Sequence, residues 1–157
     1  DFPDYQFVIA GAPSQEFSFY EGFITNENIK FVSNKTYDLL GNATAALVTS
    51  GTATLETALF KVPEVVCYKG SWISYQIAKR IITLKYISLV NLIMDEEVVT
   101  ELIQEDCSTK RIREELRKIT ESNYRQDLLK KYDILEEKLG GIGASEKTAK
   151  LIVGDLK

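Results

Sequence analysis

Residues 45–59 constrain the fold of this chain more than any other stretch of the sequence. The stretch begins as a mostly apolar run, as in a buried strand, and becomes polar at residues 50–52, Ser-Gly-Thr. Beyond this turn, apolar side chains recur with helical spacing at Leu55, Ala58, Leu59 and Val62. Pro63 ends the helical pattern, and another apolar run follows it. The sequence therefore predicts a strand–helix–strand unit with a short, hydroxyl-rich first connection.

The turn in this unit has the chemistry of a phosphate site. Backbone N–H groups at the start of a helix have no partner within the helix, so a phosphate can accept them. Gly51 allows a ligand to approach the backbone, and Ser50, Thr52 and Thr54 carry hydroxyl donors. Glu56 follows on the same helix face as Thr52, where a carboxylate can accept both hydroxyls of a ribose. A purely structural alternative stays open: Ser50 or Thr52 caps the helix, and Glu56 only complements the helix dipole.

Composition excludes several classes of function. The chain has 157 residues, enough for one domain, and a net charge of -4, which argues against a general nucleic-acid binder. It contains no histidine, which excludes a Ser-His or Cys-His nucleophile within the chain and most zinc sites. A general base must then be a carboxylate or come from elsewhere. Cys67 and Cys107 fit reduced thiols in the cytoplasm, and no apolar run is long enough to cross a bilayer.

Apolar runs and helical patterns alternate through the first half of the chain. Strands are predicted at residues 5–10, 29–32, 45–49 and 64–68, each followed by a short helical pattern or a turn. Alternation of this kind predicts one α/β domain with a parallel sheet of four or five strands and helices on both faces. In such sheets a ligand lies beyond the carboxyl ends of the strands.

The second half of the chain is expected to be mainly helical. Residues 73–84 have an apolar helical face that packs against the sheet, or alternatively faces a membrane or partner, and residues 86–93 read as an extended apolar segment. Within that segment, buried Asn91 must either satisfy backbone groups or meet a ligand. Residues from 98 onward begin a helical third, in which Gly140-Gly141 ends a long helix.

Residues 50–56, Ser-Gly-Thr-Ala-Thr-Leu-Glu, resemble the Ser-Gly-Thr-Ala-x-Leu-Glu signature of the lipid-A-disaccharide synthases. The resemblance keeps its order and spacing over residues 45–106, in segments at 63–69, 77–82, 85–92 and 99–106. It implies a three-layer, Rossmann-like sheet that lacks its first strand–helix unit. The chain would be a single partial domain, the C-terminal, UDP-sugar-binding half of a B-type glycosyltransferase. The N-terminal acceptor domain, with the family's catalytic aspartate, is missing, so no catalytic residue is assigned here and Asp1 is not expected to be the natural start.

The resemblance also implies a reaction. The family transfers 2,3-diacylglucosamine from its UDP donor to 2,3-diacylglucosamine 1-phosphate, inverting the anomeric centre and releasing UDP, with no metal or other cofactor. The positions expected to contact the diphosphate are Ser50, Gly51, Thr52 and Thr54. Glu56 would contact the ribose, and the same cleft would be lined by Asn91, Glu101 and Gln104.

The expected partners are the UDP-linked lipid donor and the lipid monosaccharide acceptor. The family further implies a homodimer, with C-terminal helices exchanged between subunits, and an enzyme peripheral to the cytoplasmic side of the inner membrane. The chain departs from the family at Val90, where a proline is usual, and at Asp95-Glu96, where a Gly-Arg pair is usual. Two alternatives stay open: the nucleotide-binding half of another UDP-sugar transferase or epimerase, and a non-catalytic binding or dimerisation module.

Overall fold

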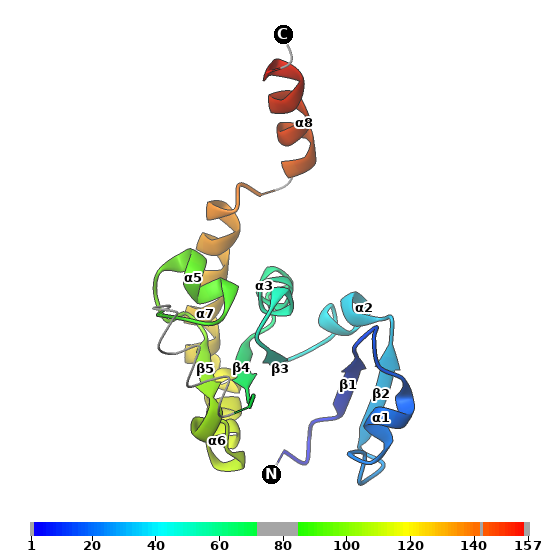
Figure 1. Cartoon of the computed structure of the whole chain (residues 1–157). Coiled ribbons are helices and arrows are strands. Elements are labelled where there is room, and N and C mark those ends of the chain that lie inside the picture. Colours follow the sequence, from blue (N-terminus) through cyan, green and yellow to red (C-terminus); the bar gives the residue numbers. More distant parts are fainter. Residues whose placement is uncertain (1, 72–84, 142, 156–157) are drawn as a thin grey trace. The chain divides into compact units, whose positions relative to one another are not determined.

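The computed structural model describes residues 2–71, 85–141 and 143–155, in which helices alternate with parallel strands (Figure 1). The chain divides into two compact units, residues 1–44 and 45–157. All strand pairs in both units are parallel, and the described residues after β5 are helical apart from short connections. This confirms the predicted α/β class with a helical C-terminal part.

The first unit is a small strand–helix–strand motif. It contains β1 (Phe7–Gly11), α1 (Phe17–Glu21), β2 (Ile29–Ser33) and α2 (Thr36–Leu40). The rings of Phe17 and Tyr20 pack against Phe31 of β2, with centroids 5.1 and 5.2 Å away. Gly11 lets the Phe31 ring approach the strand closely, because a Cβ there would lie 2.5 Å from the ring and force it to shift. Aromatic packing therefore holds α1 on the two strands.

The second unit contains the Ser-Gly-Thr turn. Its elements are β3 (Ala46–Thr49), α3 (Thr52–Leu59), β4 (Glu64–Tyr68), α5 (Leu89–Met94), β5 (Thr100–Ile103), the short 3-10 turn η1 (Gln104–Asp106), α6 (Thr109–Thr120), α7 (Ser122–Lys138) and α8 (Ala144–Asp155). Strands β3, β4 and β5 lie side by side with β4 in the centre (Figure 1). The core of this unit joins the sheet to α5, α6 and α7 through fully buried Val66, Leu102, Val90, Ile119 and Tyr132.

The four predicted strands are confirmed as β1 to β4, and the expected parallel pairing is found within each unit. The strands form a two-stranded sheet, β1–β2, and a three-stranded sheet, β3–β4–β5. A sequence pattern identifies strands by their alternating or continuous apolar residues, whereas pairing depends on where each strand lies in space. The pattern could therefore give the strands without giving the ladders between them.

Two expectations on the second unit are wrong. Residues 86–93, expected to be extended, contain helix α5, and residues 98–104, expected to begin a helix, contain strand β5. Ser88 caps α5, because its side-chain hydroxyl accepts a hydrogen bond from the backbone N–H of Asn91. Asp95 ends the helix in a left-handed conformation with φ 55°. Strand β5 completes the sheet by pairing with β4 from Val65–Thr100 to Tyr68–Ile103. Short apolar runs fit helix and strand equally well, which is why the pattern assigned both wrongly.

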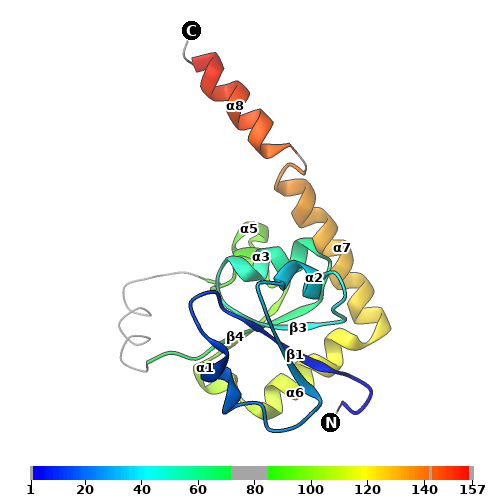
Figure 2. The ribbon, with the colours of Figure 1, turned by 90° about the vertical axis from the view of Figure 1, so that its right-hand side faces the viewer.

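The C-terminal part follows the sequence pattern closely. Figure 2 shows α7 and α8 as separate helices, and the break between them contains Gly140 and Gly141 at φ 82° and 61°. These left-handed conformations favour glycine, so the predicted glycine stop is confirmed. The helix expected at residues 73–84 lies outside the described residues. Among the helices of the described ranges, none has both the length and the apolar content needed to span a lipid bilayer.

Candidate functional site

The turn between β3 and α3 leaves the start of the helix uncapped. Gly51 occupies the N-cap position with φ 150° and ψ -163°, and in the described part of the chain no side-chain hydrogen bond caps the start of α3. This conformation is open to glycine and strained for other residues. A Cβ at Gly51 would meet no atom of the described residues within 4 Å, so these residues leave the space beside the turn open. The alternative in which Ser50 or Thr52 caps α3 is therefore wrong.

The three hydroxyl groups of the turn have different environments. Ser50 Oγ donates to the carbonyl oxygen of Ile87 at 2.8 Å. Thr54 is fully buried, and its Oγ1 donates to the Gly51 carbonyl oxygen at 2.8 Å. Thr52 is exposed and makes no side-chain hydrogen bond with any described residue. Thr52 thus offers a free hydroxyl to a ligand. The hydroxyls of Ser50 and Thr54 instead donate to backbone carbonyl oxygens and stabilise the conformation of the turn.

Glu56 lies one helical turn after Thr52 on α3, so the two side chains share a face of the helix. The Glu56 side chain is half-buried, and within the described ranges its carboxylate has neither an ion pair nor a hydrogen bond. It also lies outside the first turn of α3, where a carboxylate would complement the helix dipole most strongly. An unpaired carboxylate at this position can accept hydrogen bonds from a ligand.

Asn91 of α5 is fully buried and uses its whole amide inside the protein. Its Oδ1 accepts from the backbone N–H groups of Val98 and Val99 at 2.8 and 2.9 Å. Its Nδ2 donates to the carbonyl oxygen of Val99 at 2.8 Å and to Glu101 Oε1 at 2.9 Å. Of the two roles left open for Asn91, satisfaction of backbone groups is the one that these contacts support.

Glu101 of β5 reaches back to the start of α5. Its Oε1 accepts hydrogen bonds from the backbone N–H and the hydroxyl of Ser88, at 2.9 and 2.7 Å, as well as from Asn91. Its Oε2 accepts from the backbone N–H of Ile87 at 2.9 Å. Ser88, which is buried, takes part in these hydrogen bonds but was not predicted as a site residue. A single serine in an apolar run carries no distinguishing signal.

Gln104 follows β5 and carries an unpaired donor. Its backbone has φ 52°, a conformation that is uncommon outside glycine. Its Oε1 accepts from the Gly70 N–H at 3.2 Å, whereas its Nε2 is buried and has no partner within the described part of the chain. A buried donor without a partner is costly, so this amide group is suited to meet a ligand.

These residues gather where the strands of the second unit end. Gly51 follows β3, Gly70 follows β4 and Gln104 follows β5, and the three strands are parallel. The Gly70 N–H donates to Gln104 and so links the ends of β4 and β5. Ser50 donates to Ile87, whose N–H donates to Glu101, and this links the end of β3 to β5. The carboxyl edge of the sheet therefore combines an open helix start, a free hydroxyl, an unpaired carboxylate and an unpaired amide donor.

Two ionisable groups of β4 have strongly raised pKa values, and neither belongs to the turn between β3 and α3. Burial raises the pKa of Glu64, the first residue of β4, to about 9, and neither of its oxygens has a hydrogen-bond partner among the described residues. Burial and the neighbouring Cys107 raise the pKa of Cys67 to about 12, so this thiol stays protonated. No group of three or more His, Cys, Asp or Glu side chains suitable for a metal ion occurs within the described ranges.

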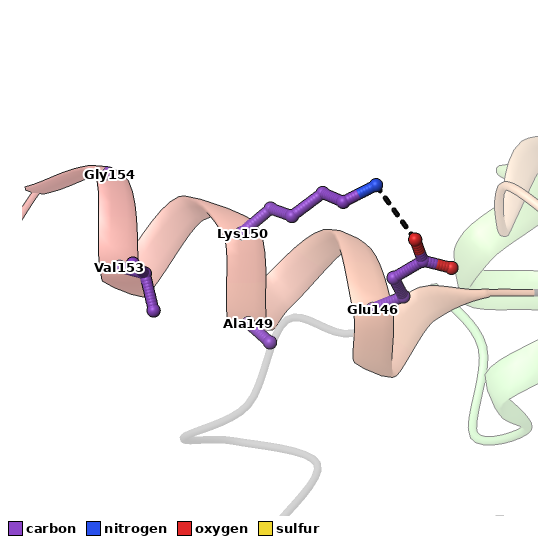
Figure 3. Close-up of a pocket in the computed structure, with 5 residues that line it drawn as sticks. All are labelled: Glu146, Ala149, Lys150, Val153 and Gly154. Carbon is purple, nitrogen blue, oxygen red and sulfur yellow. Dashed lines mark ion pairs between the residues drawn. The ribbon is translucent and has the colours of Figure 1, made fainter.

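Two surface pockets of the described residues are lined by other parts of the chain than this edge. One lies on α8 and is lined only by residues of that helix (Figure 3). Its two charged side chains, Glu146 and Lys150, form an ion pair at 2.7 Å, so neither is free for a ligand. A second pocket, of about 260 Å³, lies in the first unit beside the ends of β1 and β2. Pro13 and Asn34 are among the residues that line it. The candidate site is defined by its unpaired groups, not by either pocket.

Comparison with known proteins connects this arrangement to one family. A family model described as lipid-A-disaccharide synthetase matches residues 3–152. Curated relatives with the name lipid-A-disaccharide synthase include those of Geobacter sulfurreducens, 38% identical over 99 residues, and Idiomarina loihiensis, 37% identical over 97 residues. These matches cover 62% of this chain but only 26% and 25% of the relatives, so the matched region spans about a quarter of their length. With its family model matched over nearly all of its residues, the chain belongs to the lipid-A-disaccharide synthetase family.

Proposed function

We propose that the carboxyl edge of the β3–β4–β5 sheet binds the nucleotide of a UDP-linked lipid sugar. The single observation that carries this proposal is the uncapped start of α3, where Gly51 leaves backbone N–H groups and open space beside them. A diphosphate satisfies such N–H groups and complements the positive end of the helix dipole. The chain would be the donor-binding half of a larger transferase.

The roles of the individual side chains follow from their free groups. Thr52 donates its hydroxyl to the diphosphate, Glu56 accepts the hydroxyls of the ribose, and Gln104 donates its unpaired Nε2 to the nucleotide. Ser50 and Thr54 hold the turn in shape through their bonds to Ile87 and Gly51.

The proposed reaction transfers 2,3-diacylglucosamine from UDP to 2,3-diacylglucosamine 1-phosphate with inversion. Negative charge grows on UDP as it departs, and fixed N–H dipoles at the start of α3 stabilise that charge. The acceptor hydroxyl also needs a base within about 3 Å. Glu101 is engaged by four donors and Glu56 is assigned to the ribose, so we place this base outside this chain. The whole enzyme would act on lipid substrates as a homodimer, peripheral to the cytoplasmic face of the inner membrane.

Calorimetric titrations of the 157-residue chain with UDP, UMP and uridine test this assignment. If the diphosphate lies on the start of α3, UDP binds more tightly than UMP, and uridine binds most weakly. Equal affinity for all three ligands, or no binding of UDP at millimolar concentration, would show that the helix start is not a diphosphate site.

A further inference from the structure

The carboxylate of Glu101 is fully occupied inside the protein. Four donors reach its two oxygens: the N–H groups of Ile87 and Ser88, the Ser88 hydroxyl and the Asn91 amide, at 2.7 to 2.9 Å. A carboxylate has about four lone-pair sites, so these bonds leave it little capacity for a ligand. Glu101 therefore has the contacts of a structural anchor, even though it lies on β5 only three residues before Gln104.

The segment that Glu101 anchors is the one that holds the turn before α3. Two of its four bonds fix the backbone of Ile87 and Ser88, and the carbonyl oxygen of Ile87 accepts the Ser50 hydroxyl at 2.8 Å. Asn91 adds rigidity, because it ties the same carboxylate to the backbone of Val99. A continuous series of hydrogen bonds thus runs from β5 through Ile87 to the residue that precedes Gly51.

We propose that Glu101 is a positioning residue of the nucleotide site: it fixes the backbone of Ile87, and Ile87 in turn holds Ser50 at the start of α3. This role presupposes the nucleotide site proposed above. It differs from direct contact in one respect that can be measured. If Glu101 acts through Ser50, removal of both groups harms nucleotide binding no more than removal of either one.

A double-mutant cycle with Glu101→Gln and Ser50→Ala measures this coupling. Glutamine keeps the shape of the side chain, but its amide nitrogen cannot accept the N–H of Ile87 or Ser88. Glu97→Gln is the matched control, since it removes an exposed carboxylate four residues away that has no side-chain partner among the described residues. The readout is the Kd for UDP by calorimetry, at a temperature at which circular dichroism shows each variant to be folded.

We expect each single variant to weaken UDP binding roughly five- to tenfold, the effect of one lost hydrogen bond, and Glu97→Gln to leave the Kd unchanged. The double variant should bind within about twofold of the weaker single variant. Losses that multiply in the double variant would mean that Glu101 touches the nucleotide independently of Ser50. An unchanged Kd for Glu101→Gln would mean that it has no role in the site. Either result overturns the inference.

A measurement without ligand separates this inference from the proposed function. In the free protein, Glu101→Gln and Ser50→Ala should shift the backbone amide NMR signals of Gly51 and Thr52 in the same direction, and Glu97→Gln should not. Undisturbed signals in Glu101→Gln would reject the positioning role even if UDP binds to the wild type. If the signals shift as expected but the wild type does not bind UDP, the nucleotide site is rejected while the structural link from Glu101 to the turn stands.

Discussion

The hydroxyl of Ser50 donates to the carbonyl oxygen of Ile87 at 2.8 Å, although 37 residues separate the two in the chain. Ser50 precedes the glycine at the start of α3, and Ile87 precedes the serine that caps α5. One hydrogen bond thus connects the entries of two helices at the same edge of the sheet. This bond makes the shape of the turn depend on residues that are distant in sequence, and it explains why a local motif alone does not define the site.

The backbone of Gly51 should tolerate no other residue without strain. Its φ of 150° is unfavourable for alanine, although a Cβ there would meet no atom of the described residues within 4 Å. Gly51→Ala should therefore cost about 1–3 kcal/mol of stability through strain alone, measured by urea denaturation. The control is Gly22→Ala, which has φ -64° and equally open space, and which should be neutral or stabilising. Equal effects of the two substitutions would contradict the strain at Gly51.

The buried amide of Asn91 should be essential for folding stability. Asn91→Ala removes the partners of the Val98 and Val99 N–H groups and of the Val99 carbonyl oxygen, all in a buried site. Each unsatisfied buried group costs about 1–3 kcal/mol, so the total loss should exceed about 2 kcal/mol. Leu92→Ala, at a more exposed neighbouring position, should cost much less. A stable Asn91→Ala protein with normal denaturant midpoint would show that these bonds contribute little.

Much of the second unit, residues 45–157, could be predicted from sequence. Its elements β3, α3 and β4 have clear apolar periods, and Pro63 marks the end of the helix. The exchange of helix and strand at α5 and β5 could not be predicted, since both are short segments whose identity depends on distant contacts: β5 pairs with β4, and α5 is held by hydrogen bonds to Glu101. The pattern marked Asn91 and the family resemblance marked Glu101 and Gln104, but neither could show which groups satisfy one another. The structure distinguishes the saturated Glu101 from Gln104, whose Nε2 lacks a partner among the described residues.

Glu64 should make the protein less stable as pH rises. Burial raises its pKa from 4.5 to about 9, so the folded state keeps a proton that the unfolded state releases. Stability from this group is fully present below pH 4.5 and falls toward pH 9, with a slope of up to about 1.4 kcal/mol per pH unit. Burial also raises the pKa of the neighbouring Tyr132, which therefore stays neutral over this range.

The pH dependence of urea unfolding between pH 5 and 9 measures this effect. Glu64→Gln removes the titrating group at nearly constant shape, so the variant should lose most of the slope and be more stable than the wild type at pH 8. Parallel pH profiles for the wild type and Glu64→Gln would show that Glu64 ionises freely in the folded protein.

The exposed apolar residues of α8 should contribute to self-association. Leu151, Ile152 and Val153 are 71%, 58% and 59% exposed, so burial against a second chain would remove much apolar surface from water. We expect a dimer by light scattering at high protein concentration, and we expect Ile152→Asp to shift it toward monomer. Lys147→Asp on the same helix is a charge control that should have a smaller effect. A wild-type chain that stays monomeric at high concentration would contradict the expected homodimer.

The affinity for UDP of Glu56→Ala compared with the wild type tests the central claim most directly. The carboxylate of Glu56 makes no ion pair or hydrogen bond with other described residues, so its removal should leave the melting temperature nearly unchanged. Loss of charge-assisted bonds to the ribose should weaken UDP binding by about 1–3 kcal/mol, as measured by calorimetry. An unchanged UDP affinity together with a melting temperature lowered by several degrees would mean that Glu56 only stabilises α3, and the nucleotide site would have to lie elsewhere.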